Sequence, residues 1–110
     1  MIVVLADVHA QVAQRAAVSE AMLAAQAAAR EQDGCLSFVY AETLEEPGRF
    51  LAAERWRDAA AFAAHFRSDS YQVYIAELTP LLVRETEVRV YEGQEARLLD
   101  PETLDLRQDD

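Results

Sequence analysis

The order in which strand-like and helix-like segments follow one another constrains the fold of this chain more than any other feature. Strand-like segments are β-branched or alternate in character, whereas helical segments are rich in alanine, glutamine and other helix formers. The strand-like segments are residues 2–8, 35–42, 49–56 and 85–92, and the helical segments are residues 12–32, 59–66 and 70–79. This order is that of the ferredoxin-like split βαβ arrangement. We therefore predict an α+β domain whose helices cover one face of a four-stranded antiparallel sheet.

The sheet face that the helices leave open has a composition that favours a homodimer. Along residues 49–56, Glu54 and Trp56 share one face of the strand and Leu51 lies on the other. Along residues 35–42, both faces are partly apolar. An exposed apolar sheet face is unfavourable in water, and two such faces packed together would bury it. We expect two chains to pair into a dimeric α+β barrel.

Length and charge restrict the partners of the chain. Its 110 residues suffice for one domain, and its formal net charge of -10 argues against nucleic acid and against anionic membrane surfaces. No apolar run approaches the roughly 20 residues that span a bilayer, and residues 1–7 lack the basic region of a signal peptide. The single cysteine, Cys35, excludes an internal disulfide. We expect a cytoplasmic protein.

The chain divides into a folded part and a tail. Residues 1–92 contain all the predicted strands and helices and form the domain. Residues 93–110 are mostly polar and acidic, with four leucines interspersed. We expect this tail to be either disordered or packed on the partner subunit.

Three motifs occur in an order and spacing typical of a known family. Residues 34–35, Gly-Cys, open the second strand, and residues 47–50, Pro-Gly-Arg-Phe, form a hairpin. Glu54 and Trp56 follow, with His65 nine positions after the tryptophan. In these motifs the chain resembles the antibiotic biosynthesis monooxygenase family, and its quinol monooxygenase branch in particular. The resemblance covers nearly all of the chain except the tail.

The resemblance implies a small dimeric oxygenase that works without a cofactor. Ser70 stands where the quinol branch often has a second histidine, five positions after the first. Haem-degrading members carry Asn, Trp and His at positions that correspond to Asp7, His65 and Ile75, so we expect no haem. Two histidines and one cysteine, widely separated, form no metal signature, and three glycines form no phosphate loop. We therefore expect neither metal nor cofactor.

His65 and Glu54 are the candidate catalytic residues. A neutral imidazole can accept a proton near physiological pH, and a cofactor-free oxygenase must deprotonate its phenolic or quinol substrate. Glu54 would orient His65 in that role. The alternative for His65 is a structural hydrogen bond that holds its helix on the sheet. The alternative for Glu54 is an ion pair with Arg55 or Arg84 of either chain, because a buried carboxylate needs a partner.

Five further residues are candidates for binding the substrate. Aromatic side chains can stack on a flat aromatic molecule, but large aromatic residues are also the main components of cores. Asp7 could bind a substrate hydroxyl if it points into the cavity, and it is a solvated acid if it points outward. The candidate substrate-binding residues are Trp56, Tyr74, Asp7, Phe62 and Tyr40.

These residues support three hypotheses about function. The first is a monooxygenase that oxidises a quinol or polycyclic phenol with dioxygen. The second is a non-enzymatic small-molecule-binding or stress-associated dimer that uses the same pocket. The third is an isomerase that acts on a small hydroxyketone and consumes no oxygen.

Overall fold

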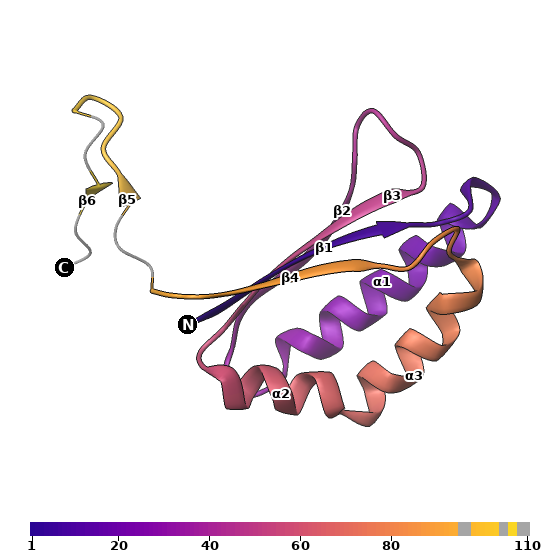
Figure 1. The fold of residues 1–110 in the computed structure, drawn as a ribbon, viewed down its shortest axis with the longest axis horizontal. Helices are drawn as coiled ribbons and strands as arrows, with labels where there is room; N and C mark the ends of the chain where they lie inside the picture. The colour runs from indigo at the N-terminus through magenta and orange to yellow at the C-terminus, as the bar shows by residue number, and fades with distance from the viewer. Residues whose placement is uncertain (95–97, 104–105, 108–110) are drawn as a thin grey trace.

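The computed structural model describes residues 1–94, 98–103 and 106–107 of the chain. The strands and helices follow one another along the chain in the predicted order (Figure 1). The elements of the main domain are β1 (Ile2–His9), α1 (Arg15–Arg30), β2 (Cys35–Glu42), β3 (Arg49–Trp56), α2 (Ala59–Arg67), α3 (Asp69–Leu78) and β4 (Glu87–Glu92). The four strands form one antiparallel sheet in the order β2-β3-β1-β4. The predicted ferredoxin-like fold is confirmed.

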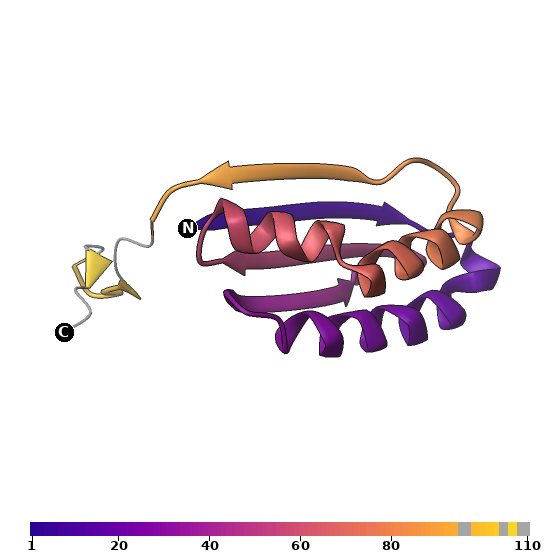
Figure 2. The same cartoon turned by 90° about the horizontal axis from the view of Figure 1, so that it is seen from below.

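All three helices lie on one side of the sheet (Figure 1). Strand β4 forms the edge of the sheet beyond the helices (Figure 2), and its six residues are exposed. None of the helices in the described part of the chain has the length and apolarity that a membrane span requires.

The core lies between the sheet and the helices. Val4, Phe38 and Trp56 project from three different strands and are fully or almost fully buried, as is Val18 of α1. Burying each of these side chains contributes roughly 1.5–3 kcal/mol. The alternation predicted for β3 is present, since Phe50, Ala52, Glu54 and Trp56 are buried and their neighbours along the strand are more exposed.

Local capping sets the helix boundaries. The predicted first helix begins at residue 12, but residues Val12–Gln14 form a 3₁₀ turn and α1 starts only at Arg15. The Asp58 side chain accepts a hydrogen bond from the Ala61 amide, so Asp58 is the N-cap of α2. Ser68 caps α3 in the same way, through the Tyr71 amide.

The opposite face of the sheet is open and partly apolar. Leu5, Val39, Leu51 and Tyr91 come from four strands, and each is between 44% and 50% exposed. This is the face on which the expectation of a homodimer depends. The pairing itself stays a prediction.

Beyond β4, the described part of the tail contains two short strands. Strands β5 (Leu98–Leu99) and β6 (Leu106–Arg107) pair antiparallel. The predicted tail also includes residues 95–97, 104–105 and 108–110, which lie outside the described residues.

Candidate functional site

A cavity of about 710 Å³ lies between the sheet and the pair of helices α2 and α3. Its floor comes from Val4, Ala6 and Val8 of β1, and most of its walls are apolar or aromatic. Polar groups are interspersed among these side chains, and apolar surface combined with polar groups is typical of small-molecule sites. The polar and ionisable residues of the lining are Tyr40, Glu54, His65, Tyr71, Gln72, Tyr74, Thr79, Arg84, Glu85 and Thr86.

His65 projects from α2 into this cavity and is 4% exposed. Its Nδ1 atom lies 2.7 Å from Oε1 of Gln32, whereas Nε2 is buried without a hydrogen-bond partner among the described residues. Burial lowers the pKa of His65 to about 4, because a charged imidazolium would lose its hydration there. The imidazole is therefore neutral at physiological pH.

Glu54 reaches the same cavity from the centre of β3. One carboxyl oxygen, Oε1, accepts a hydrogen bond of 3.0 Å from the Trp56 indole and lies 4.0 Å from Nε2 of His65. Burial raises the pKa of Glu54, although the Trp56 hydrogen bond opposes this. The sequence left open whether Glu54 and His65 meet. They face each other with a gap slightly too long for a hydrogen bond.

Trp56 supports the pair from behind. Its indole is fully buried and stacks on the His65 imidazole, with ring centroids 4.6 Å apart. It is not among the residues that line the cavity. Trp56 therefore holds Glu54 and His65 in place, and the structure does not position it as a wall for the substrate.

Three tyrosines in the cavity wall form a cluster that reaches His65. Tyr40 comes from β2, and Tyr71 and Tyr74 come from α3. Burial raises the pKa of Tyr71 to about 12 and that of Tyr74 to about 12, and it raises the pKa of Tyr40 further. All three are therefore neutral phenols at physiological pH. Phe62 of α2 also lines the cavity, as the sequence indicated.

Asp7 lies on the other face of the sheet. Even-numbered residues of β1 point into the cavity, so odd-numbered ones point away from it. Its carboxylate accepts two hydrogen bonds from Arg49, of 2.9 and 2.8 Å, and lies 3.2 Å from Nε2 of His9. The Arg49 hydrogen bond lowers the pKa of Asp7. The structure therefore separates Asp7 from the other candidate site residues.

Gln32 and Ser68 belong to the site, but the sequence did not single them out as partners of His65. Gln32 follows the end of α1, and its amide bridges His65 and the Ser68 hydroxyl. No motif marks this glutamine. Only the close approach of the α1–β2 loop to α2 reveals its role.

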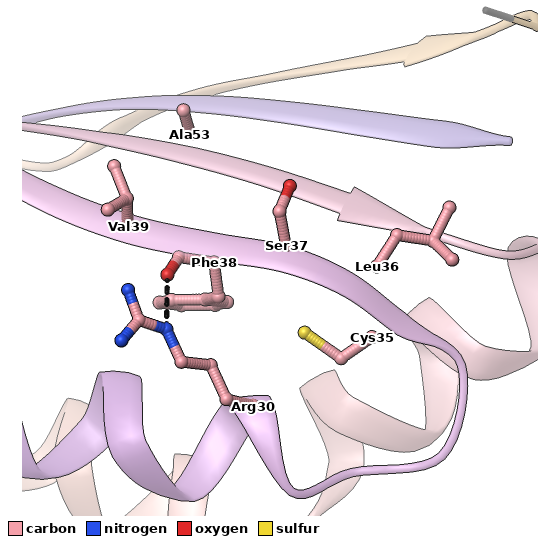
Figure 3. Close-up of a pocket in the computed structure, with 7 residues that line it drawn as sticks. All are labelled: Arg30, Cys35, Leu36, Ser37, Phe38, Val39 and Ala53. Atoms are coloured by element: carbon pink, nitrogen blue, oxygen red, sulfur yellow. Dashed lines mark hydrogen bonds between the residues drawn. The ribbon is translucent and has the colours of Figure 1, made fainter. Parts of the chain in front are cut away.

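A second, shallower depression of about 440 Å³ lies at the edge strand β2 (Figure 3). There the Arg30 side chain donates to the Phe38 carbonyl at 2.9 Å. Further along the same strand, outside the depression, Gln26 accepts from the Tyr40 amide at 2.9 Å. Both side chains come from α1 and satisfy the open edge of the strand. Burial raises the pKa of Cys35, so its thiol is a weak nucleophile. This depression contains no acid–base pair, and the larger cavity is the better candidate site.

Within the described residues, no cluster of three or more His, Cys, Asp or Glu side chains could hold a metal ion. The His65, Glu54 and tyrosine side chains in the lining of the larger cavity can act through proton transfer, hydrogen bonding and aromatic contact.

Solved structures with this fold come from several bacteria. A Deinococcus radiodurans protein, whose name assigns it provisionally to the antibiotic biosynthesis monooxygenases, is 28% identical, with a TM-score of 0.83 over 87% of this chain and 95% of that one. A Mycobacterium tuberculosis protein is 27% identical, with a TM-score of 0.80 over 86% of this chain and 96% of that one.

A curated relative from Synechocystis, an uncharacterised protein, is 30% identical over 70 residues, which are 64% of this chain. The chain spans about half, 48%, of the length of that relative.

The profile of the antibiotic biosynthesis monooxygenase family matches residues 1–77, which include β1 to β3, all of α2 and most of α3. The matched region carries both His65 and Glu54. The chain belongs to the antibiotic biosynthesis monooxygenase family.

Proposed function

We propose that the cavity binds a quinol or polycyclic phenol and that the protein oxidises it with dioxygen, without a cofactor, as a member of the quinol monooxygenase branch. One observation carries this proposal. The Nε2 atom of His65 is a buried polar atom without a hydrogen-bond partner in the described part of the chain, and it belongs to a residue that lines a largely apolar and aromatic cavity. A buried acceptor of this kind is costly unless a ligand satisfies it, and a substrate hydroxyl would do so.

The chemistry needs only a base and dioxygen. His65 takes the proton of the substrate hydroxyl, and the resulting electron-rich anion reduces dioxygen directly. One oxygen atom forms a bond to a ring carbon, and it becomes a carbonyl of the quinone formed from a phenol or the hydroxyl of the hydroxyquinone formed from a quinol. The other leaves as water with two hydrogens of the substrate. The substrate itself supplies all four electrons, so the balance requires no external reductant.

The surroundings of His65 fit this role. When Nε2 accepts the proton, the imidazolium forms 4.0 Å from the Glu54 carboxyl group, whose negative charge would stabilise it. Phe62, Tyr40 and Tyr74 supply apolar and aromatic contact for a flat ring. Burial lowers the pKa of His65 to about 4, so the neutral imidazole that can accept a proton is the form present at physiological pH.

We also propose that the functional unit is a homodimer that buries the open sheet face. The four half-exposed apolar side chains on that face, Leu5, Val39, Leu51 and Tyr91, support this pairing.

Oxygen uptake tests the proposed function. Protein free of metal and flavin is mixed with a panel of quinols and hydroxyanthracene-like phenols in an oxygen electrode. We expect uptake that depends on the protein and is lost in His65→Gln, while the control His9→Gln retains it. Uptake that is equal in the wild type and His65→Gln contradicts the role of His65. A compound that raises the melting temperature but returns unchanged in air indicates the binding-protein function instead.

A further inference from the structure

A chain of three polar side chains connects the end of α1 to α2. Gln32 Oε1 lies 2.7 Å from His65 Nδ1, and Gln32 Nε2 donates to the Ser68 hydroxyl at 3.3 Å. The Ser68 hydroxyl in turn donates to the His65 carbonyl at 2.7 Å. Gln32 does not line the cavity, so it meets the site only through the far side of the imidazole.

The network fixes which way the Gln32 amide points. The single hydrogen of the Ser68 hydroxyl is committed to the His65 carbonyl, so its oxygen can only accept from Gln32. The Gln32 NH₂ group must then face Ser68, and its carbonyl oxygen must face His65. An amide carbonyl cannot donate, so Nδ1 of His65 must carry the hydrogen.

A neutral imidazole with its hydrogen on Nδ1 has its lone pair on Nε2. This is the atom that lacks a partner. The opposite tautomer has a competing attraction, because a hydrogen on Nε2 would point toward Glu54 Oε1, 4.0 Å away. Gln32 is within hydrogen-bond distance of the ring and Glu54 is not, so the balance favours Nδ1–H.

We propose that Gln32 is a positioning residue that holds His65 as the Nδ1–H tautomer and so directs the basic lone pair of Nε2 into the cavity. The catalytic consequence rests on the proposed function, but the tautomer itself does not. Tautomer selection through the second ring nitrogen is a general means of preparing a histidine for its task.

The other groups around the imidazole do not dictate the same outcome. Glu54 faces it from β3, Tyr71 packs on it from α3 with ring centroids 4.6 Å apart, and Phe38 packs on it from β2. Of the described neighbours, Gln32 is the one whose hydrogen bond to Nδ1 selects a tautomer.

Long-range ¹H–¹⁵N correlation spectra of the imidazole rings test this directly, because the chain has only two histidines. His9 lies on the opposite face of the sheet and serves as an internal reference. In the wild type at neutral pH, we expect a protonated Nδ1 and an unprotonated Nε2 for His65. In Gln32→Leu, which removes the acceptor, we expect the hydrogen to move largely to Nε2. In Gln32→Glu, the Nδ1–H form should persist and the pKa of His65 should rise.

Turnover of a substrate gives the second measurement. We expect Gln32→Leu to lower kcat about tenfold with little change in KM. A tenfold change in rate corresponds to the free energy that one hydrogen bond typically contributes. Gln32→Glu should restore kcat and move the pH profile upward. The control Gln11→Leu removes the side-chain hydrogen bond to the Pro80 carbonyl, and it should leave kcat and the pH profile unchanged.

Two results would overturn the inference. One is a wild-type His65 with its hydrogen on Nε2, and the other is a folded Gln32→Leu protein that keeps a pure Nδ1–H ring. A tautomer switch in Gln32→Leu without oxygen uptake by any variant would support the role of Gln32 and count against the monooxygenase.

Discussion

The indole of Trp56 lies stacked on the imidazole of His65, with ring centroids 4.6 Å apart and planes inclined by 26°. The same indole donates its N–H to Glu54, so one buried side chain positions both candidate catalytic residues. Because Trp56 is the only tryptophan in the chain, all tryptophan fluorescence of the protein comes from this site.

We predict that the fluorescence of Trp56 titrates with a midpoint near the His65 pKa of about 4. A protonated imidazole in stacking contact quenches an indole more strongly than a neutral one does. Emission recorded during an acid titration should therefore fall through this range in the wild type and in His9→Gln. The same transition in His65→Gln would show that another group causes it.

The buried His65 should make the protein less stable as the pH falls from about 6.5 to about 4. The pKa of His65 is lower in the folded protein than in the unfolded chain. The unfolded chain therefore binds the proton first and is stabilised relative to the folded protein over that interval. We expect a loss of roughly 2–3 kcal/mol in the free energy of unfolding. Urea unfolding at several pH values should show this slope in the wild type and a flatter one in His65→Gln. Asp7 contributes at lower pH, since its pKa is lowered.

Glu54→Gln should stabilise the fold at neutral pH by roughly 1 kcal/mol, because an amide is cheaper to bury than a carboxylate and can still accept the Trp56 hydrogen bond. The raised folded-state pKa of Glu54 means that the wild type regains this stability as the pH falls through that pKa. The difference between the two proteins should therefore shrink in acid. Thermal unfolding measures it, with the exposed Glu20→Gln as control. A variant that is less stable than the wild type would contradict the assigned burial cost.

Gly34→Ala should destabilise the protein by roughly 2 kcal/mol. Gly34 has a φ of +81°, and an added Cβ would lie 2.5 Å from the Cβ of Ala61 in α2. Because the same loop carries Gln32, the activity should fall as well. Gly93→Ala is the matched control, since nothing lies within 4 Å of its added Cβ. Equal melting temperatures for the two variants would mean that the loop can move away from α2 at little cost.

Leu51→Glu should convert the proposed dimer to a monomer. Leu51 is 45% exposed at the centre of the open sheet face, where a carboxylate would be buried unpaired between two subunits. Leu44→Glu, at a fully exposed position in the hairpin that follows β2, is the control. Sedimentation measures the mass of each protein. A wild type that sediments as a monomer would contradict the proposed homodimer.

Strict alternation is the reason that part of the site could be predicted. The pattern along residues 49–56 gave both the bounds of β3 and the inward direction of Glu54 and Trp56, and the structure agrees. His65 was a candidate because it stands nine positions after Trp56, which is the spacing typical of the family.

Other features depend on contacts that no local pattern encodes. Along residues 2–8 the chain is apolar on both faces, so the sequence could not decide which way Asp7 points. The hydrogen bond between Gln32 and His65 joins residues 33 positions apart and exists only because the α1–β2 loop packs against α2. The stacking of Trp56 on His65, likewise, depends on where α2 crosses β3.

Turnover under isotopically labelled dioxygen tests the central claim most directly. A quinol or hydroxyanthracene that supports oxygen uptake is incubated with metal-free and flavin-free protein, and the product is analysed by mass spectrometry. The account predicts one labelled oxygen atom in each quinone formed by the wild type and no enzymatic product with His65→Gln. An unlabelled quinone, or labelled product formed equally fast by His65→Gln, would contradict it.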